Sequence, residues 1–183
     1  MTEKGKPVIL GISGSLRKDA NTDKLMQYIS TQFEGRNSIF EWVHPKDFKL
    51  TLPGVQNKSD DPEHLREKVF SCDGILFVTP EYHGSLSSSL KMLIDNLGYP
   101  STLEGKNISL FGVAMGPSAD NAIRHLKEIL SVVNANVLPI QTSIGSIHKV
   151  FDGENINLEK ELQDSINNSI SELITICSNQ NSS

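Results

Sequence analysis

Apolar residues along this chain alternate between short continuous runs and longer segments with helical spacing. Five short runs are predicted to be strands: 7–12, 38–43, 74–79, 107–114 and 136–140. The run 74–79 (GILFVT) is almost continuously apolar, so both faces of the predicted strand are apolar. A strand buried in a parallel sheet requires this pattern. Pro139 cannot donate a ladder hydrogen bond, so the last, short strand is predicted to lie at a sheet edge.

Between these strands, apolar residues recur every three or four positions, which is the spacing of one helix face. The predicted helices cover 22–33, 87–97, 118–133 and a segment from about 158 to 173, and a further helix opens at Pro62 after Asp61 as N-cap. Their predicted inward positions are Leu25, Ile29 and Phe33; Leu90, Leu93, Ile94 and Leu97; Ile123, Leu126, Leu130 and Val133; and Leu158, Leu162, Ile166, Ile170 and Leu173.

The regular alternation of strand and helix predicts a three-layer α/β fold with a parallel sheet covered by helices on both faces. Five strands in 183 residues favour the strand order 2-1-3-4-5 over a six-stranded dinucleotide fold. The length indicates a single domain over 1–183, in which 1–5 and 178–183 are expected to be disordered.

Composition narrows the classes of partner. The net charge of −5 argues against a nucleic-acid-binding surface, which would be basic. No apolar run reaches the roughly 18 residues of a membrane span, and the first ten residues lack a secretory apolar region. The two cysteines, Cys72 and Cys177, form no pair motif, so we expect structural thiols in a reducing cytoplasm.

The segment 11–22 (GISGSLRKDANT) leads from the first strand into the first helix and contains the groups of an anion site. Free N–H groups at a helix N-terminus favour an anion, and Ser15, Arg17, Asn21 and Thr22 add donors and a cation. The segment is neither a Walker A motif nor G-x-G-x-x-G, so a single terminal phosphate fits it best. In the alternative interpretation, Asn21 and Thr22 only cap the helix and Arg17 is solvated.

The same segment also suggests a serine hydrolase, because GISGS approaches the G-x-S-x-G nucleophile motif. The motif fails at Ser15, and no aspartate or histidine partner can be assigned. Ser13 is expected to point back into the sheet, so it is not assigned to the site.

A second segment rich in functional groups, 79–85 (TPEYHGS), follows the third strand. Pro80 stiffens this loop, and Gly84 permits an unusual backbone dihedral. Backbone N–H and C=O groups of such a loop can bind the edge of a flat heterocycle, and Tyr82 can form a wall beside its ring. Glu81 could instead be solvated or bind loop amides, and His83 could be a surface or packing residue.

The motifs GSLRKDANT and TPEYHGSLSSSLKMLIDNL together resemble those of the NADPH-dependent FMN reductase family, a flavodoxin-like group that includes azoreductases and quinone or chromate reductases. The resemblance covers nearly the whole chain. It implies a phosphate site at Ser15, Arg17 and Thr22, with Asn21 between them; a flavin-ring site at Pro80, Glu81, Tyr82 and His83; and a third loop at Met115 and Gly116. Two departures are visible: Ala20 replaces a common serine, and the segment 114–121 lacks the usual Gly-Gly.

The resemblance further implies bound FMN, with NADPH or NADH as reductant and a small-molecule acceptor such as a quinone, an azo compound, a metal oxyanion or free flavin. Hydride would reach the acceptor through the cofactor, so no catalytic residue and no metal ligand are assigned, and no nucleic acid or membrane partner is expected. Leu86 and Met92 fall outside the inward helix face, which favours a homodimer or homotetramer through 86–97. A flavin-binding electron carrier and a non-enzymatic sensor remain as alternatives.

Overall fold

The computed structural model describes residues 5–55, 62–152 and 155–180. The strands are β1 (Val8–Ser13), β2 (Ile39–Val43), β3 (Gly74–Pro80), β4 (Asn107–Val113), β5 (Asn136–Ile144), β6 (Phe151–Asp152) and β7 (Asn155–Ile156). The helices are α1 (Asn21–Phe33), α2 (Pro62–Ser71), α3 (Ser88–Asp95), α4 (Asp120–Val132), α5 (Ile147–Val150) and α6 (Lys160–Gln180), with a 3₁₀ turn η1 (Pro45–Asp47).

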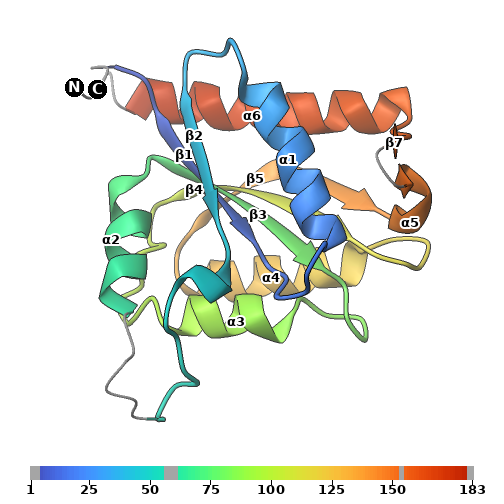
Figure 1. The fold of residues 1–183 in the computed structure, drawn as a ribbon. Coiled ribbons are helices and arrows are strands. Elements are labelled where there is room, and N and C mark those ends of the chain that lie inside the picture. The colour runs from blue at the N-terminus through green and yellow to red at the C-terminus, as the bar shows by residue number, and fades with distance from the viewer. Residues whose placement is uncertain (1–4, 56–61, 153–154, 181–183) are drawn as a thin grey trace.

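The central sheet is parallel and has the strand order β2-β1-β3-β4-β5, which confirms the predicted topology. Its strands point toward the end of the sheet at which α1 begins (Figure 1). The loops that follow β1, β3 and β4 therefore meet at this carboxyl edge, where open α/β sheets bind their ligands.

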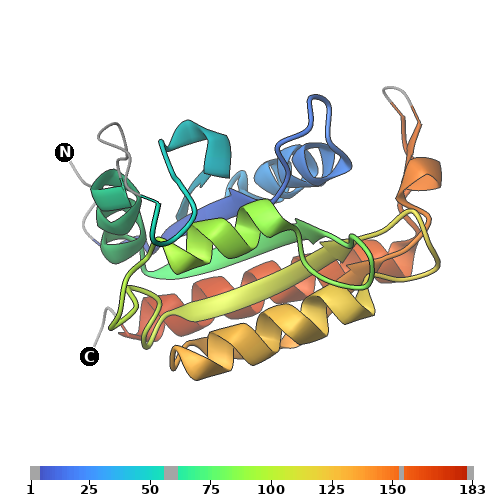
Figure 2. The same cartoon turned by 90° about the horizontal axis from the view of Figure 1, so that it is seen from below.

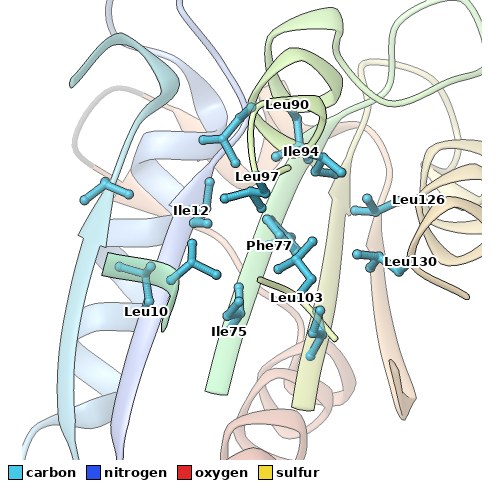
Figure 3. Packing of buried hydrophobic residues seen from close by; sticks show 14 of the residues in the cluster. Leu10, Ile12, Ile75, Phe77, Leu90, Ile94, Leu97, Leu103, Leu126 and Leu130 are labelled. Carbon is cyan, nitrogen blue, oxygen red and sulfur yellow. The ribbon is translucent and has the colours of Figure 1, made fainter. Parts of the chain in front are cut away.

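The side chains of the central strands alternate between two apolar cores, one on each face of the sheet. On one face, Leu10, Ile12 and Phe77 pack against α2, α3 and α4. Figure 3 shows Phe77 of this cluster beside Ile94 of α3 and Leu126 of α4. On the other face, Ile9 and Leu76 pack against α1 and α6. The three layers are seen from a second direction in Figure 2.

The predicted inward positions explain most of this packing, and Pro62 does open α2. The predicted N-cap, Asp61, lies outside the described residues. Leu86 is buried at 9% exposure, so the prediction that it lies outside the inward face is wrong; Met92 is half-buried.

The C-terminal third departs most from the predicted elements. β5 is longer than predicted and extends to Ile144, although it does form the sheet edge. α5 and the β6-β7 hairpin were not predicted, since they are too short to show a period. α6 continues to Gln180, whose side-chain Oε1 accepts a hydrogen bond from Asn107 Nδ2 at 2.7 Å, so 178–180 are helical and not disordered as expected. Of the two ends expected to be disordered, 1–4 and 181–183 lie outside the described residues.

Both cysteines are buried, unpaired thiols, as expected for structural residues. Burial raises the pKa of Cys72 to about 12 and that of Cys177 to about 11, so both thiols stay protonated near neutral pH. Within the described residues, no helix combines the length and the apolar character that a bilayer span would need.

Candidate active site

The three loops at the carboxyl edge of the sheet line two adjoining hollows of about 270 and 490 Å³. The first hollow is lined by eight of the predicted site residues: Ser15, Arg17, Asn21, Thr22, Pro80, Glu81, Tyr82 and Met115. The second adds His83 and Gly116. Both share Arg17, Glu81, Tyr82 and Met115, so the structure brings all ten residues to one continuous site.

The first hollow ends at the N-terminus of α1, where backbone donors lack partners. The N-cap is Ala20, which has no side-chain acceptor, so Asn21 and Thr22 do not cap the helix as the alternative interpretation proposed. Ala20 O accepts from the N–H groups of Asp23 and Lys24, whereas no described residue accepts from those of Asn21 and Thr22. Free N–H groups and the helix dipole make this end attractive to an anion.

Arg17 supplies a flexible cation to the first hollow. Its guanidinium lies over the Tyr82 ring, with Cζ 5.1 Å from the ring centroid, and no described carboxylate lies within ion-pair distance of it. Its backbone N–H donates to Ser15 Oγ at 3.2 Å, which holds the loop in a compact turn. An exposed Arg17 side chain can therefore reach a ligand without breaking an ion pair to a described residue.

A tight hairpin turn carries Tyr82, the residue whose ring lies against Arg17. Tyr82 and Ser85 exchange backbone hydrogen bonds of 2.9 and 3.1 Å across His83 and Gly84. Both central residues have positive φ, 50° and 72°, which confirms the unusual dihedral expected at Gly84. The N–H groups of His83 and Gly84 have no acceptor among the described residues.

Comparisons with known proteins agree with this geometry. The family model for NADPH-dependent FMN reductase matches residues 7–149. The chain belongs to the NADPH-dependent FMN reductase family. It is 32% identical over 147 residues to an NADPH azoreductase from Bacillus sp. (strain OY1-2), covering 78% of this chain and 79% of that protein.

Two further relatives extend the picture. An FMN-dependent NADPH-azoreductase from Staphylococcus aureus (strain USA300) is 27% identical over 137 residues, covering 71% of this chain and 72% of that protein. The solved structure of the flavoenzyme FerB, an NAD(P)H:(acceptor) oxidoreductase from Paracoccus denitrificans, superposes with a TM-score of 0.75 at 23% identity, covering 94% of this chain and 98% of that one. The similarity to FerB shows the fold. Membership of the family shows that the chain is an FMN-dependent oxidoreductase that uses NAD(P)H.

In this member of the reductase family, the Glu81 side chain has partners within the protein. Oε2 accepts from the Ala122 N–H at 3.1 Å, and Oε1 from Asn121 Nδ2 at 3.4 Å, so the carboxylate caps α4. The Glu81 N–H donates to Val113 O at 2.8 Å. The Glu81 N–H is therefore not free for a ligand, and the Glu81 carboxylate joins the turn at Tyr82 to α4.

Buried hydroxyl groups fix the first loop against the second. Gly14 O accepts hydrogen bonds from Ser87 Oγ and Ser89 Oγ, and its N–H donates to Val78 O at 2.7 Å. A Cβ at position 14 would lie 3.1 Å from Ser87 Oγ and from Val78 O, which favours glycine there. The relative position of the two reductase motifs is thus set by direct contacts.

Thr22 does line the hollow, but its hydroxyl is turned largely inward. Thr22 Oγ1 lies 3.0 Å from Ser13 Oγ and 3.4 Å from Asp23 Oδ1. Ser13 is fully buried and donates to Asp23 Oδ1 at 2.6 Å, which confirms that it points into the protein. The Ser13 hydroxyl contacts the Asp23 carboxylate, but no described histidine contacts it and it is fully buried, so the serine hydrolase alternative lacks both a histidine base and an accessible nucleophile.

The third loop places Met115 at the mouth of the site with 63% of its surface exposed. Its neighbours are fixed by α5: Gly116 O accepts from the Ser146 N–H, and Ala114 O accepts from the Ile147 N–H. Ile147 therefore lines the first hollow. Sequence reasoning missed Ile147, because a single apolar residue after a strand has no motif that marks it.

Proposed function

We propose that the two hollows together bind one FMN, with its phosphate at the N-terminus of α1 and its ring system between Tyr82 and Met115. The supporting observation is the match between a two-part ligand and a two-part site. One hollow ends in the unpaired N–H groups of Asn21 and Thr22 and the Arg17 cation, as a phosphate requires. The other is wider and is flanked by Tyr82 and the exposed Met115.

When bound, FMN supplies the hydride exchange between NAD(P)H and an acceptor, so the protein needs no nucleophile of its own. The chain contributes binding and orientation. The turn at His83 and Gly84 offers two backbone N–H groups without internal acceptors, which can bind an electron-rich edge of the ring. Glu81 holds this turn against α4, which keeps these donors in a fixed direction.

We propose a small, flat acceptor, such as a quinone or an azo compound, as the second substrate. The second hollow holds about 490 Å³ and is open beside the exposed Met115 and His83, so it can admit a planar molecule next to a bound ring. Two relatives are named azoreductases, which favours an azo compound among these candidates; a metal oxyanion or free flavin would fit the same opening.

We also propose a symmetric homodimer, or a tetramer built from it, through the region 86–97. A groove of about 490 Å³ lies between α3 and α4, with Leu86 and Ile129 at its apolar floor and Lys91 and Glu128 among its lining residues. Around a two-fold axis, Lys91 of one copy can lie against Glu128 of the other, which suits a self-complementary surface; within one chain these groups pair with Asp95 and Arg124. The two buried, unpaired cysteines suit a reducing cytoplasm.

Substitution of Arg17 tests the phosphate assignment directly. In Arg17→Ala, loss of a charge-assisted hydrogen bond should weaken FMN binding by about 1.5–3 kcal/mol, roughly ten- to hundredfold, as measured by quenching of flavin fluorescence. Arg124→Ala is the matched control, because Arg124 pairs only with Glu128 among the described residues, on the exposed surface of α4. Equal FMN affinity in both variants would place the phosphate elsewhere.

The remaining alternatives differ in redox behaviour. A reductase loaded with FMN is yellow, is bleached by NADPH under anaerobic conditions and regains its colour on addition of a quinone. An electron carrier would keep its colour with NADPH, and a sensor that has lost flavin binding would stay colourless after incubation with FMN.

A further inference from the structure

A half-buried polar cluster lies directly beneath the proposed phosphate end of the site. It joins the end of β1, the first turn of α1 and the turn that follows β2. Asp23 is its centre: Oδ1 accepts from Ser13 Oγ at 2.6 Å, and Oδ2 lies 3.0 Å from His44 Nε2. The side chains of Asp23 and His44 are only 15% and 13% exposed.

The Asp23 carboxylate lies close to a site that is proposed to bind an anion, which is unexpected for a negative charge. Asp23 Oδ1 is 3.4 Å from the hydroxyl of Thr22, which itself lines the first hollow. A negative charge in the first turn of α1 reduces the positive potential that a phosphate would meet there. A partner that offsets this charge is therefore needed, and His44 is the basic side chain in contact with Asp23 among the described residues.

His44 is held in this position from several sides. Its ring lies 4.9 Å from the Trp42 ring, centroid to centroid, and its Nδ1 lies 3.5 Å from Oδ2 of the more exposed Asp47. The groups facing the imidazole are thus two carboxylates and one neutral ring. His44 Nε2 lies close to Asp23 Oδ2 without an aligned hydrogen bond to any described residue, so its effect on the carboxylate is electrostatic, and an imidazolium offsets more of that charge than a neutral imidazole.

We propose that His44 and Asp23 are positioning residues for the phosphate end of the FMN site, an inference that rests on the proposed function. His44 draws the Asp23 carboxylate away from the hollow and offsets its charge. Asp23 in turn holds the Ser13 hydroxyl, against which Thr22 is oriented. The residues that bind the phosphate are thereby supported by two residues from outside the loop motif.

Paired titrations with FMN and riboflavin test this proposal, because riboflavin lacks the phosphate. His44→Phe keeps a ring beside Trp42 but leaves Asp23 without its partner. We expect FMN affinity to fall about tenfold and riboflavin affinity to stay within twofold of wild type. Asp23→Asn/His44→Phe removes the unbalanced charge and should restore FMN affinity to within about threefold. Asp47→Asn removes the other carboxylate that faces the ring but keeps an oxygen acceptor for the His44 backbone N–H; it is the matched control and should alter FMN affinity less than twofold.

An equal loss for FMN and riboflavin, an unchanged FMN affinity in His44→Phe, or no recovery in the double variant would overturn the proposal. Should His44→Phe fail to fold, the single variant Asp23→Asn tests the proposal, because Asn can still accept the hydrogen bond from Ser13. Asp23→Asn should bind FMN two- to threefold more tightly than wild type and riboflavin equally well. Equal or weaker FMN binding would overturn the proposal. If wild type does not prefer FMN to riboflavin, the proposed function itself fails.

Discussion

The two ends of the central sheet use their polar groups in opposite ways. At the amino end, polar side chains bind one another or the backbone: Lys106 Nζ donates to the carbonyls of Phe70 and Cys72, and Asp73 accepts from the Val8 N–H. At the carboxyl end, the N–H groups of Asn21 and Thr22 have no internal acceptor in the described chain. Donors that already have partners stabilise the fold, whereas donors without them retain hydrogen-bonding capacity for a ligand.

This contrast predicts that substitutions at the amino end change stability and leave flavin binding intact. The largest effect is expected for Gly74→Ala, because its Cβ would lie 2.6 Å from Cys177 Sγ and 3.0 Å from Leu173 Cδ1. Overpacking of this kind should lower the free energy of unfolding in urea by about 2–3 kcal/mol. FMN affinity should change less than threefold.

Gly74→Ala/Cys177→Ala is the control for this clash. Removal of Sγ should recover at least half of the lost stability. A Gly74→Ala protein with normal stability and a tenfold weaker affinity for FMN would contradict the proposed separation between the two ends.

The buried thiols predict a smaller, pH-dependent effect at the same end. Because burial raises the pKa of Cys72 to about 12 and that of Cys177 to about 11, the folded state keeps both protons above pH 9, where the unfolded chain loses them. Stability should therefore fall as pH rises from 9 to 10, by about 1 kcal/mol for each thiol. Urea unfolding at pH 8, 9 and 10 measures this slope, and a Cys72→Ala/Cys177→Ala protein with an equally steep slope would refute its cause.

The smallest effect is expected at the carboxyl end, where the Glu81 carboxylate, like the hydroxyl groups of Ser87 and Ser89, already has partners within the protein. Glu81→Ala removes the acceptor for the Ala122 N–H at the start of α4 and should cost about 1 kcal/mol of stability. Glu81→Gln keeps an oxygen acceptor and should lose about half as much in thermal unfolding. Equal stability of Glu81→Ala and wild type would mean that this contact does not hold the turn.

Much of the fold could be predicted because hydrophobic spacing reports directly on burial. Continuous apolar runs became the central strands, and the positions at helical spacing, such as Leu25 and Ile29, are fully buried. The spacing could not show that Leu86, just before α3, also turns into the core, because its burial depends on the path of the preceding loop. Short elements such as α5 contain too few residues for a period.

The candidate site was predictable where function depends on local motifs and hidden where it depends on contacts distant in sequence. Ser15 and Tyr82 meet at one edge because parallel strands carry their loops to the same place. The contact between Asp23 and His44 joins residues on different elements, and no local pattern marks either one. The same holds for Glu81, whose partner at Ala122 follows the next strand.

Diffraction from crystals grown with FMN tests the central claim most directly. We predict the phosphate within hydrogen-bonding distance of the Asn21 and Thr22 N–H groups, and the ring system between Tyr82 and Met115. FMN bound at any other surface, or with its phosphate away from the start of α1, would contradict the account.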